Sequence, residues 1–339
     1  MALVKDKMYY TYNDVTIVPS IISNIEHRSE CIPWDEDGML PLFTAPMNTV
    51  VSEDNFKLFE ENHINAILPR TAPLDTRKFY STKGRWAAYS LKEFSDVFCN
   101  EDDKLPTTHK LKALIDVANG HMKIIFDLAR KAKSIYGNDI ILMGGNIANP
   151  KTYEEYARAG FDYVRCGIGG GCGCISSSQL GVHFPMASLI DEIATLKKEI
   201  EEDYRYLPKI IADGGVRNYR DIIKALSLGA DYVMVGSVFA KMEESAAPKE
   251  TDEEGNLVAT FYGMASREGQ IALNGAKTKT SEGIKKKLPV EYTMEGWTKN
   301  FIDYLRSAMS YVGYKSLDSF RKYTTVIINS PNAVCAVNN

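Results

Sequence analysis

Short apolar segments rich in β-branched residues recur along the chain and alternate with longer segments of helical period. Helical periodicity is clearest at Met122–Tyr136, Lys151–Ala159 and Asp221–Leu228. Strands that alternate with helices in this way pair in parallel, and each helix crosses over from one strand to the next. Eight apolar segments predict strands: Pro41–Met47, Asn65–Arg70, Arg85–Leu91, Ala113–Ala118, Ile140–Ile147, Tyr163–Gly169, Lys209–Gly215 and Tyr232–Ser237.

Eight strands are the number that a closed (β/α)8 barrel needs, so we expect one TIM-barrel domain over residues 1–339. A doubly wound open sheet is the structural alternative. Two stretches without helical or strand period, Cys172–Pro185 and Glu244–Pro289, follow the sixth and eighth predicted strands. Loops of this length in a compact domain are usually lids or binding loops, so we expect long active-site loops there.

Polar residues and glycines follow six of the predicted strands. In a barrel the carboxyl-terminal ends of all strands open on one face, where the active sites of such enzymes lie. We therefore expect these six loops to converge on one pocket. They are Asn48-Thr49, Asn119-Gly120, Gly144–Asn146, Gly169–Cys174, Asp213–Gly215 and Gly236-Ser237.

Composition narrows the setting. The formal net charge is −4 and charged residues are spread along the chain, which argues against the clustered cations that nucleic-acid binding needs. No run of roughly 18 apolar residues occurs, and Met1–Tyr10 lacks the apolar centre of a signal peptide. The six cysteines do not form the pattern of a secreted disulfide framework. We expect a cytoplasmic protein without nucleic-acid or membrane partners.

The segment Cys166–Cys174 combines glycines with three thiols at the end of a predicted strand. Glycines let the backbone approach a ligand closely, and a thiol among exposed backbone amides can act as a nucleophile. Cys172 or Cys174 could serve. Two other interpretations stand beside this one: a plain tight turn with small apolar cysteines, and a three-thiol metal site. The Cys-x-Cys spacing without a second paired motif is not typical of zinc.

Two neighbouring predicted strands, Lys209–Gly215 and Tyr232–Ser237, end in an Asp-Gly-Gly turn and a Gly-Ser turn. In barrels the loops after strands seven and eight commonly hold a phosphate through backbone amides. Asp213 is well placed to accept hydrogen bonds from sugar hydroxyls. Either motif alone could be a glycine turn with a helix-capping aspartate, but together they predict a phosphorylated sugar as ligand.

In this order the motifs resemble the IMP dehydrogenase and GMP reductase family. The resemblance implies a (β/α)8 barrel, usually a homotetramer, and selects Cys174 over Cys172 as the nucleophile. No tandem cystathionine-β-synthase module interrupts the pattern. The matching segments span most of the chain: Tyr10–Pro19, Ala45–Val50, Gly167–Cys174, Gly181-Val182 with Pro185, Ile211–Val216, Met234–Ser237, Tyr262–Met264 and Ser281–Gly283.

Asp116–Gly120 (DVANG) is similar to the reductase signature, whereas the dehydrogenases carry an Asp-Ser-Ser-Gln-Gly-like loop. Dehydrogenases also use an Arg-Tyr pair in a long flap, and between Met264 and Glu282 the chain has Arg267 without such a pair. The resemblance therefore implies NADPH-dependent reductive deamination of GMP to IMP. Oxidation of IMP to XMP with NAD is the alternative, and an inactive nucleotide-binding homologue is a second one.

Residue roles follow from the same resemblance, with a purine nucleoside monophosphate as ligand. The catalytic residues implied are Cys174, Ser176 and Glu282, although ordinary loop polarity would equally explain the last two. The substrate residues implied are Asp213, Gly214, Gly215, Gly236, Ser237, Tyr262, Gly263, Met264, Ser281 and Gly283. The NADPH residues implied are Arg28, Arg70, Asp116, Val117, Ala118, Asn119, Gly120, Ile168, Gly169, Ser307 and Ser310. A monovalent cation, typically potassium, is implied at Gly169, Gly171 and Cys174.

Several positions depart from the family pattern. Asn48 stands where the family usually has Asp, and Cys172 occupies a position that is normally small and polar. Ile175–Ser177 replaces the Thr-Thr-Arg that normally follows the cysteine, and the loss of arginine at Ser177 removes a positive charge. These changes cluster around the expected substrate and cation sites.

Overall fold

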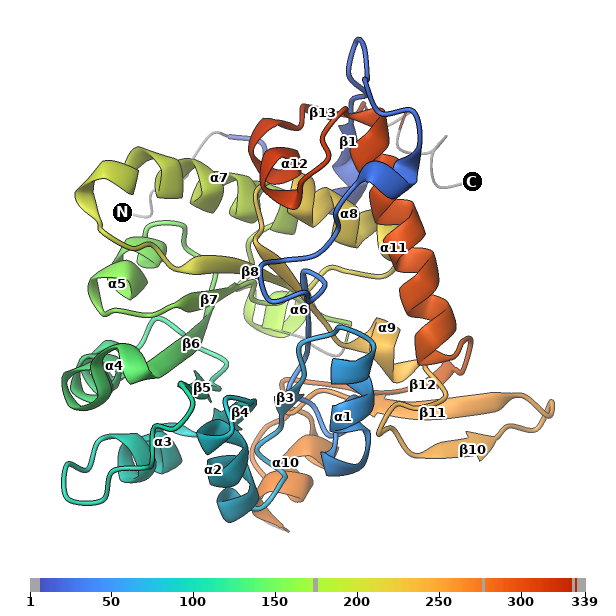
Figure 1. Cartoon of the computed structure of the whole chain (residues 1–339). Helices are drawn as coiled ribbons and strands as arrows, with labels where there is room; N and C mark the ends of the chain where they lie inside the picture. The colour runs from blue at the N-terminus through green and yellow to red at the C-terminus, as the bar shows by residue number, and fades with distance from the viewer. Residues whose placement is uncertain (1–6, 173–175, 276–277, 331–332, 334–339) are drawn as a thin grey trace.

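Eight parallel strands form one sheet in the computed structural model, which describes residues 7–172, 176–275, 278–330 and 333 (Figure 1). Their order is β2-β9-β8-β7-β6-β5-β4-β3. A parallel bridge between Phe43 and Asn65 joins the two ends, and the Thr44 N–H donates to the Asn65 carbonyl at 2.9 Å. This closure confirms the (β/α)8 barrel and excludes the open sheet. The strands are β2 (Leu42–Thr44), β3 (Ile67–Leu68), β4 (Trp86–Tyr89), β5 (Leu111–Ile115), β6 (Ile140–Ile147), β7 (Tyr163–Cys166), β8 (Lys209–Asp213) and β9 (Tyr232–Val235).

Helices surround the barrel and cover the outward side of the strands (Figure 1). The three helices predicted most clearly are present within two residues of their expected bounds, as α4 (Lys123–Tyr136), α5 (Thr152–Arg158) and α8 (Tyr219–Ser227). The others around the barrel are α1 (Glu53–Glu61), α2 (Leu74–Thr82), α3 (Leu91–Phe98), α7 (Met186–Glu199), α9 (Ser237–Ala240), α11 (Met294–Tyr311) and α12 (Leu317–Tyr323).

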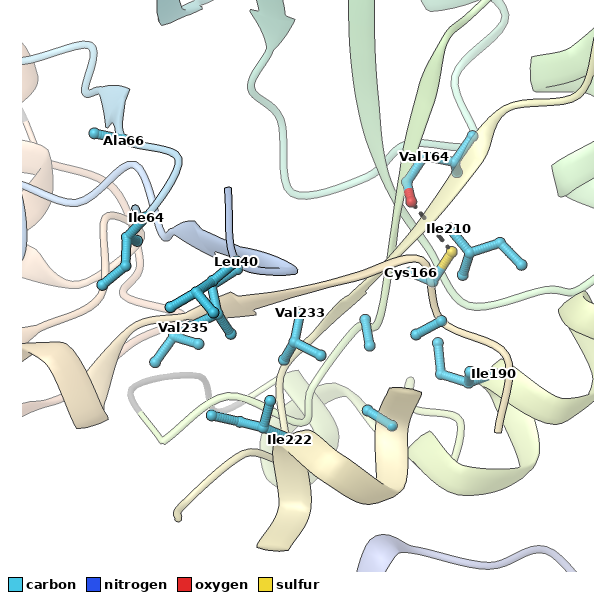
Figure 2. Close-up of a cluster of buried hydrophobic side chains, with 14 of the residues drawn as sticks. Leu40, Ile64, Ala66, Val164, Cys166, Ile190, Ile210, Ile222, Val233 and Val235 are labelled. Carbon is cyan, nitrogen blue, oxygen red and sulfur yellow. Dashed lines mark hydrogen bonds between the residues drawn. The ribbon is translucent and has the colours of Figure 1, made fainter. Parts of the chain in front are cut away.

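Strand alternation sorts the side chains into two cores. On β7, Val164 and Cys166 point outward and belong to the outer core, a buried cluster that also includes Ile190 of α7 and Ile222 of α8 (Figure 2). The alternate residues of β7, Tyr163 and Arg165, point into the barrel. There the rings of Phe43, Trp86, Tyr163 and Tyr232 meet edge to face or tilted with centroids 5.1–5.9 Å apart. This aromatic layer fills the barrel below its carboxyl-terminal opening.

Two aspartates clasp the amino-terminal end of the barrel in the same way. Asp162 accepts the backbone N–H of Leu142 at 2.7 Å and the ammonium of Lys133 at 2.8 Å. Asp231 accepts the N–H of Ile210 at 2.7 Å and the ammonium of Lys197 at 2.8 Å. Both aspartates lie in a Gly-x-Asp-Tyr-Val segment that leads into a strand. Each clasp ties a strand, its neighbour and a helix together.

The segment Glu244–Pro289 has more regular structure than the sequence analysis expected. It contains α10 (Arg267–Asn274) and a three-stranded antiparallel sheet of β10 (Lys249–Thr251), β11 (Leu257–Tyr262) and β12 (Lys285–Pro289). The pattern was missed because β12 is rich in lysine and no residue in it is buried. In the Cys172–Pro185 stretch, the short helix α6 spans Ser176–Leu180. A separate pair, β1 (Val15–Ile17) with β13 (Val326–Ile328), joins segments from near the two ends of the chain.

Candidate functional site

A cavity of about 810 Å³ lies at the carboxyl-terminal ends of the barrel strands. The loops after β2, β5, β6, β7, β8 and β9 all contribute to its lining, as the sequence analysis predicted. Part of the β10–β12 insertion and α10 covers it from the other side. The predicted site residues that line it are Arg70, Asp116, Val117, Ala118, Gly171, Asp213, Gly214, Gly215, Gly236, Ser237, Gly263, Met264 and Glu282.

Arg165 organises the base of this cavity. It points inward from β7, and its guanidinium forms ion pairs with Asp116 at 2.8 Å and with Asp213 at 2.9 Å. The three side chains are only 9%, 16% and 17% exposed. Burial alone would lower the pKa of the guanidinium, but the two carboxylates raise it above its ordinary value, so Arg165 stays charged. It therefore fixes the predicted cofactor loop and the predicted substrate loop relative to each other.

Asp213 is held so that one oxygen remains for a ligand. Its Oδ2 accepts hydrogen bonds from Arg165 Nε at 3.1 Å, from Arg165 Nη2 at 2.9 Å and from Asn146 Nδ2 at 2.7 Å. Among the described residues no donor to Oδ1 is found, and Asp213 lines the cavity. A carboxylate oxygen fixed in this way can accept hydrogen bonds from the hydroxyls of a sugar.

Arg70 lines the cavity next to Asp116. Arg70 Nη1 donates to the Asp116 carbonyl at 2.9 Å, and the two side chains approach to 3.8 Å. Asn119 and Gly120, predicted as cofactor ligands, do not line the cavity. Gly120 packs so closely on Asn146 that an added Cβ would lie 2.6 Å from the Asn146 carbonyl oxygen. Gly120 therefore shapes the loop that presents Asp116.

His121 supports the same loop from below. Its Nε2 accepts the backbone N–H of Ala148 at 3.1 Å, so the proton resides on Nδ1, which donates to Thr152 Oγ1 at 3.0 Å. Partial burial lowers the pKa of His121 below its ordinary value. The neutral ring thus joins the loop after β5 to the loop after β6.

Three more predicted substrate residues lie beside the cavity without lining it. Tyr262 Oη accepts a hydrogen bond from Asn48 Nδ2 at 2.9 Å. The Ser281 hydroxyl donates to the Gly283 carbonyl at 2.6 Å and so stabilises the turn that carries Glu282. Asn48 Oδ1 is buried and has no partner among the residues described.

The cysteine loop divides into separate environments. Cys166 is completely buried in the outer core, where its thiol contacts the Val164 carbonyl at 3.5 Å (Figure 2). Burial raises the pKa of this thiol, so it is unreactive. Cys172 is exposed and lines the cavity. Cys166 and Cys172 therefore do not share a metal site. Cys174, the predicted nucleophile, lies outside the described residues, as does the side chain of Ser176.

The carbonyls of Ile168 and Gly169 already have hydrogen-bond donors. His183 Nδ1 donates to Ile168 O at 2.9 Å, and Ser177 Oγ donates to Gly169 O at 3.2 Å. Ile168 and Gly169 do not line the cavity, whereas Gly171 does. Of the three residues predicted to hold potassium, Gly169 has its carbonyl bonded to the Ser177 hydroxyl, and Gly171 lies at the cavity wall. The third, Cys174, lies outside the described residues.

Arg28, Ser307 and Ser310 lie together away from the cavity, on the outer helix α11 and the chain that crosses it. Arg28 pairs with Asp303 at 3.0 Å and donates to Ser307 Oγ at 3.4 Å. Ser310 Oγ donates to the Ser307 carbonyl at 2.8 Å. The structure of one chain therefore splits the predicted NADPH residues into a cavity group and an outer group.

Sequence reasoning missed Arg165, Gln270 and Lys279, which also line the cavity. Asn146, which lines it too, belongs to one of the six loops that were predicted to converge there. Arg165 had a readable signal, because a charged residue alternating with apolar ones near the end of a buried strand has to face a counter-charge. Gln270 and Lys279 had none, since they lie in the insertion whose regular structure was not predicted.

Within the described part of the chain, no three His, Cys, Asp or Glu side chains come together as metal ligands. No helix described is both long and apolar enough to cross a membrane.

The fold and the cavity define a barrel protein whose carboxyl-terminal loops form one ligand-sized site with charged side chains at its base. A family model described as the IMP dehydrogenase / GMP reductase domain matches residues 107–336. A protein named GMP reductase from Staphylococcus carnosus (strain TM300) is 31% identical over 95% of this chain and 97% of its own length. One of the same name from Phytophthora infestans is 33% identical over 63% of this chain and 57% of its own length. The chain belongs to the IMP dehydrogenase / GMP reductase family of oxidoreductases.

Proposed function

We propose that this protein is an NADPH-dependent GMP reductase that converts GMP to IMP and ammonia. The observation that carries the proposal is the joint placement of Asp213, the Gly214-Gly215 turn and the Gly171-Cys172 segment around one cavity. Arg70 and Asp116 line the same cavity. Support also comes from the relatives, which are named GMP reductase over nearly the full length of this chain. The signature loop Asp116–Gly120 supports the reductase branch.

In the proposed reaction the Cys174 thiolate adds to C2 of GMP, and ammonia leaves to give a covalent thioimidate. When bound, NADPH supplies the hydride that reduces C2. The thiolate then departs and IMP is released. This divides one difficult displacement into easier steps. Ser176 and Glu282 move the protons that the leaving amine requires, and Met264 and Glu282 meet the edge of the base.

The cavity residues fit the cofactor on its charged side. Arg70 is a half-buried cation whose guanidinium is fixed by the Asp116 carbonyl, and Val117 and Ala118 offer an apolar surface beside it. These residues would hold and orient NADPH next to the nucleotide. The outer group of Arg28, Ser307 and Ser310, the homotetramer and the potassium ion stay predictions.

Incubation with GMP and NADPH tests the proposal. We expect loss of reduced-nicotinamide absorbance together with release of ammonia, and Cys174→Ala should abolish both. Reduction of NAD with IMP instead would make the protein an IMP dehydrogenase. Nucleotide binding without thiol-dependent turnover would make it an inactive homologue.

A further inference from the structure

One of the three consecutive lysines on β12 faces the cavity side of the sheet, and its neighbours do not. β12 pairs antiparallel with β11, and Lys286 lies directly opposite Phe261. Directly paired residues project to the same face, whereas successive residues alternate. Phe261 is buried and lines the cavity. Lys286 therefore projects to that face, and Lys285 and Lys287 project away from it.

The Lys286 ammonium reaches the cysteine loop. Its Nζ lies 3.6 Å from Cys172 Sγ, and Cys172 lines the cavity. Across the described chain no carboxylate forms an ion pair with Lys286, whereas Lys287 pairs with Glu250 on the other face. Arg165 is neutralised by two aspartates, and Arg70 approaches one of them. Lys286 thus brings an uncompensated positive charge to the cavity rim.

The cysteine loop that Lys286 contacts lies against the glycine turn after β8. Gly215 N–H donates to the Gly170 carbonyl at 2.8 Å, and an added Cβ on Gly214 would lie 3.2 Å from Gly171 N. Gly171, Cys172, Gly214 and Gly215 therefore form one continuous wall. A flexible lysine stem lets an ammonium beside this wall follow an anion bound there.

We propose that Lys286 binds the phosphate of the substrate and determines the specificity of this site for phosphorylated ligands. The proposal rests on the proposed function in taking a nucleoside monophosphate as that ligand. An ammonium is a natural partner for a phosphate dianion, and a charge-assisted hydrogen bond of this kind is about twice as strong as a neutral one.

Calorimetry on the full chain with Lys286→Met tests the proposal. We expect GMP and ribose 5-phosphate to bind roughly 10- to 100-fold more weakly, as the loss of a charge-assisted hydrogen bond predicts. Lys286→Arg should restore most of the affinity. Lys285→Met is the matched control, because it removes an equal charge from the opposite face of the same strand, and it should bind both ligands as the unmodified protein does. The thermal midpoints of all the variants should coincide.

Unchanged GMP and ribose 5-phosphate affinity in Lys286→Met would overturn the proposal, as would an equal loss in Lys285→Met. A loss that arginine does not restore would also overturn it. Because ribose 5-phosphate has no base to reduce, its binding tests the role of Lys286 independently of the proposed reductase activity. A protein that fails to turn over GMP but needs Lys286 for ribose 5-phosphate would refute only the reductase.

Discussion

Removal of the Arg165 guanidinium should destabilise the protein strongly. Arg165→Met leaves Asp116 and Asp213 facing each other in the base of the cavity without their shared cation, and both side chains are less than one-fifth exposed. Loss of one partner from a buried ion pair typically costs about 3–5 kcal/mol, because the remaining charge stays desolvated. We therefore expect a loss of about 3–5 kcal/mol in the free energy of unfolding, measured by urea denaturation with an unchanged m-value.

Arg158→Met is the control, because Arg158 also pairs with two acidic residues, Glu154 and Glu155, but is 51% exposed. Solvent screens such pairs, so this variant should unfold close to the parent. The triple change Arg165→Met, Asp116→Asn and Asp213→Asn removes the uncompensated charges and should recover most of the lost stability. If Arg165→Met were as stable as Arg158→Met, or if the triple variant recovered nothing, the charge argument would be wrong.

Three further outcomes follow from the loops. Because the pKa of His121 is lowered from 6.5, its contribution to stability is complete above about pH 6.5 and is lost as pH falls through the folded-state pKa. His121→Asn should flatten that part of the urea-unfolding profile, and an unchanged slope would contradict the assignment. Gly167→Ala should prevent folding, seen as loss of soluble protein, because an added Cβ would overlap the Asp213 carbonyl. Iodoacetamide should label exposed Cys172 and spare buried Cys166 in the native protein, as peptide mass spectrometry would show; labelling of both would contradict the burial.

The barrel was predictable because its signals are periodic and local. Eight apolar segments of the right length, each followed by Gly or polar residues, indicate both the parallel strands and the face on which their loops meet. The cavity confirms this convergence at Asp116, Asp213 and Gly236, which line it from the carboxyl-terminal ends of three strands. The β10–β12 insertion was not predictable in this way, because β10 and β12 contain no buried residue and so lack the apolar pattern that marks β11.

The contacts between loops were beyond the sequence for a different reason. Nothing in the order of residues indicates that Asn146 and Arg165 would converge on the same oxygen of Asp213, since that depends on the register of three strands. The same holds for Lys286 and Cys172, which are 114 positions apart in the chain. Family resemblance transfers roles along a sequence, but it does not by itself give the contacts between side chains of different loops.

The clasps of Asp162 and Asp231 hold the barrel at the end remote from the cavity. Burial alone would raise the pKa of Asp231, but the positive charges of Lys197 and Arg321 lower it. The carboxylate therefore stays charged and keeps its hydrogen bonds to Ile210 and Lys197. These contacts stabilise the barrel at its amino-terminal end, where no ligand is expected. The sequence of the loops at the carboxyl-terminal end can therefore vary more. Substitutions at this rim, such as those at Asn48 and Ser177, can therefore change ligand recognition while the barrel stays folded. Libraries randomised at that rim should consequently yield mostly folded proteins, provided that tightly packed glycines such as Gly120 and Gly167 are kept.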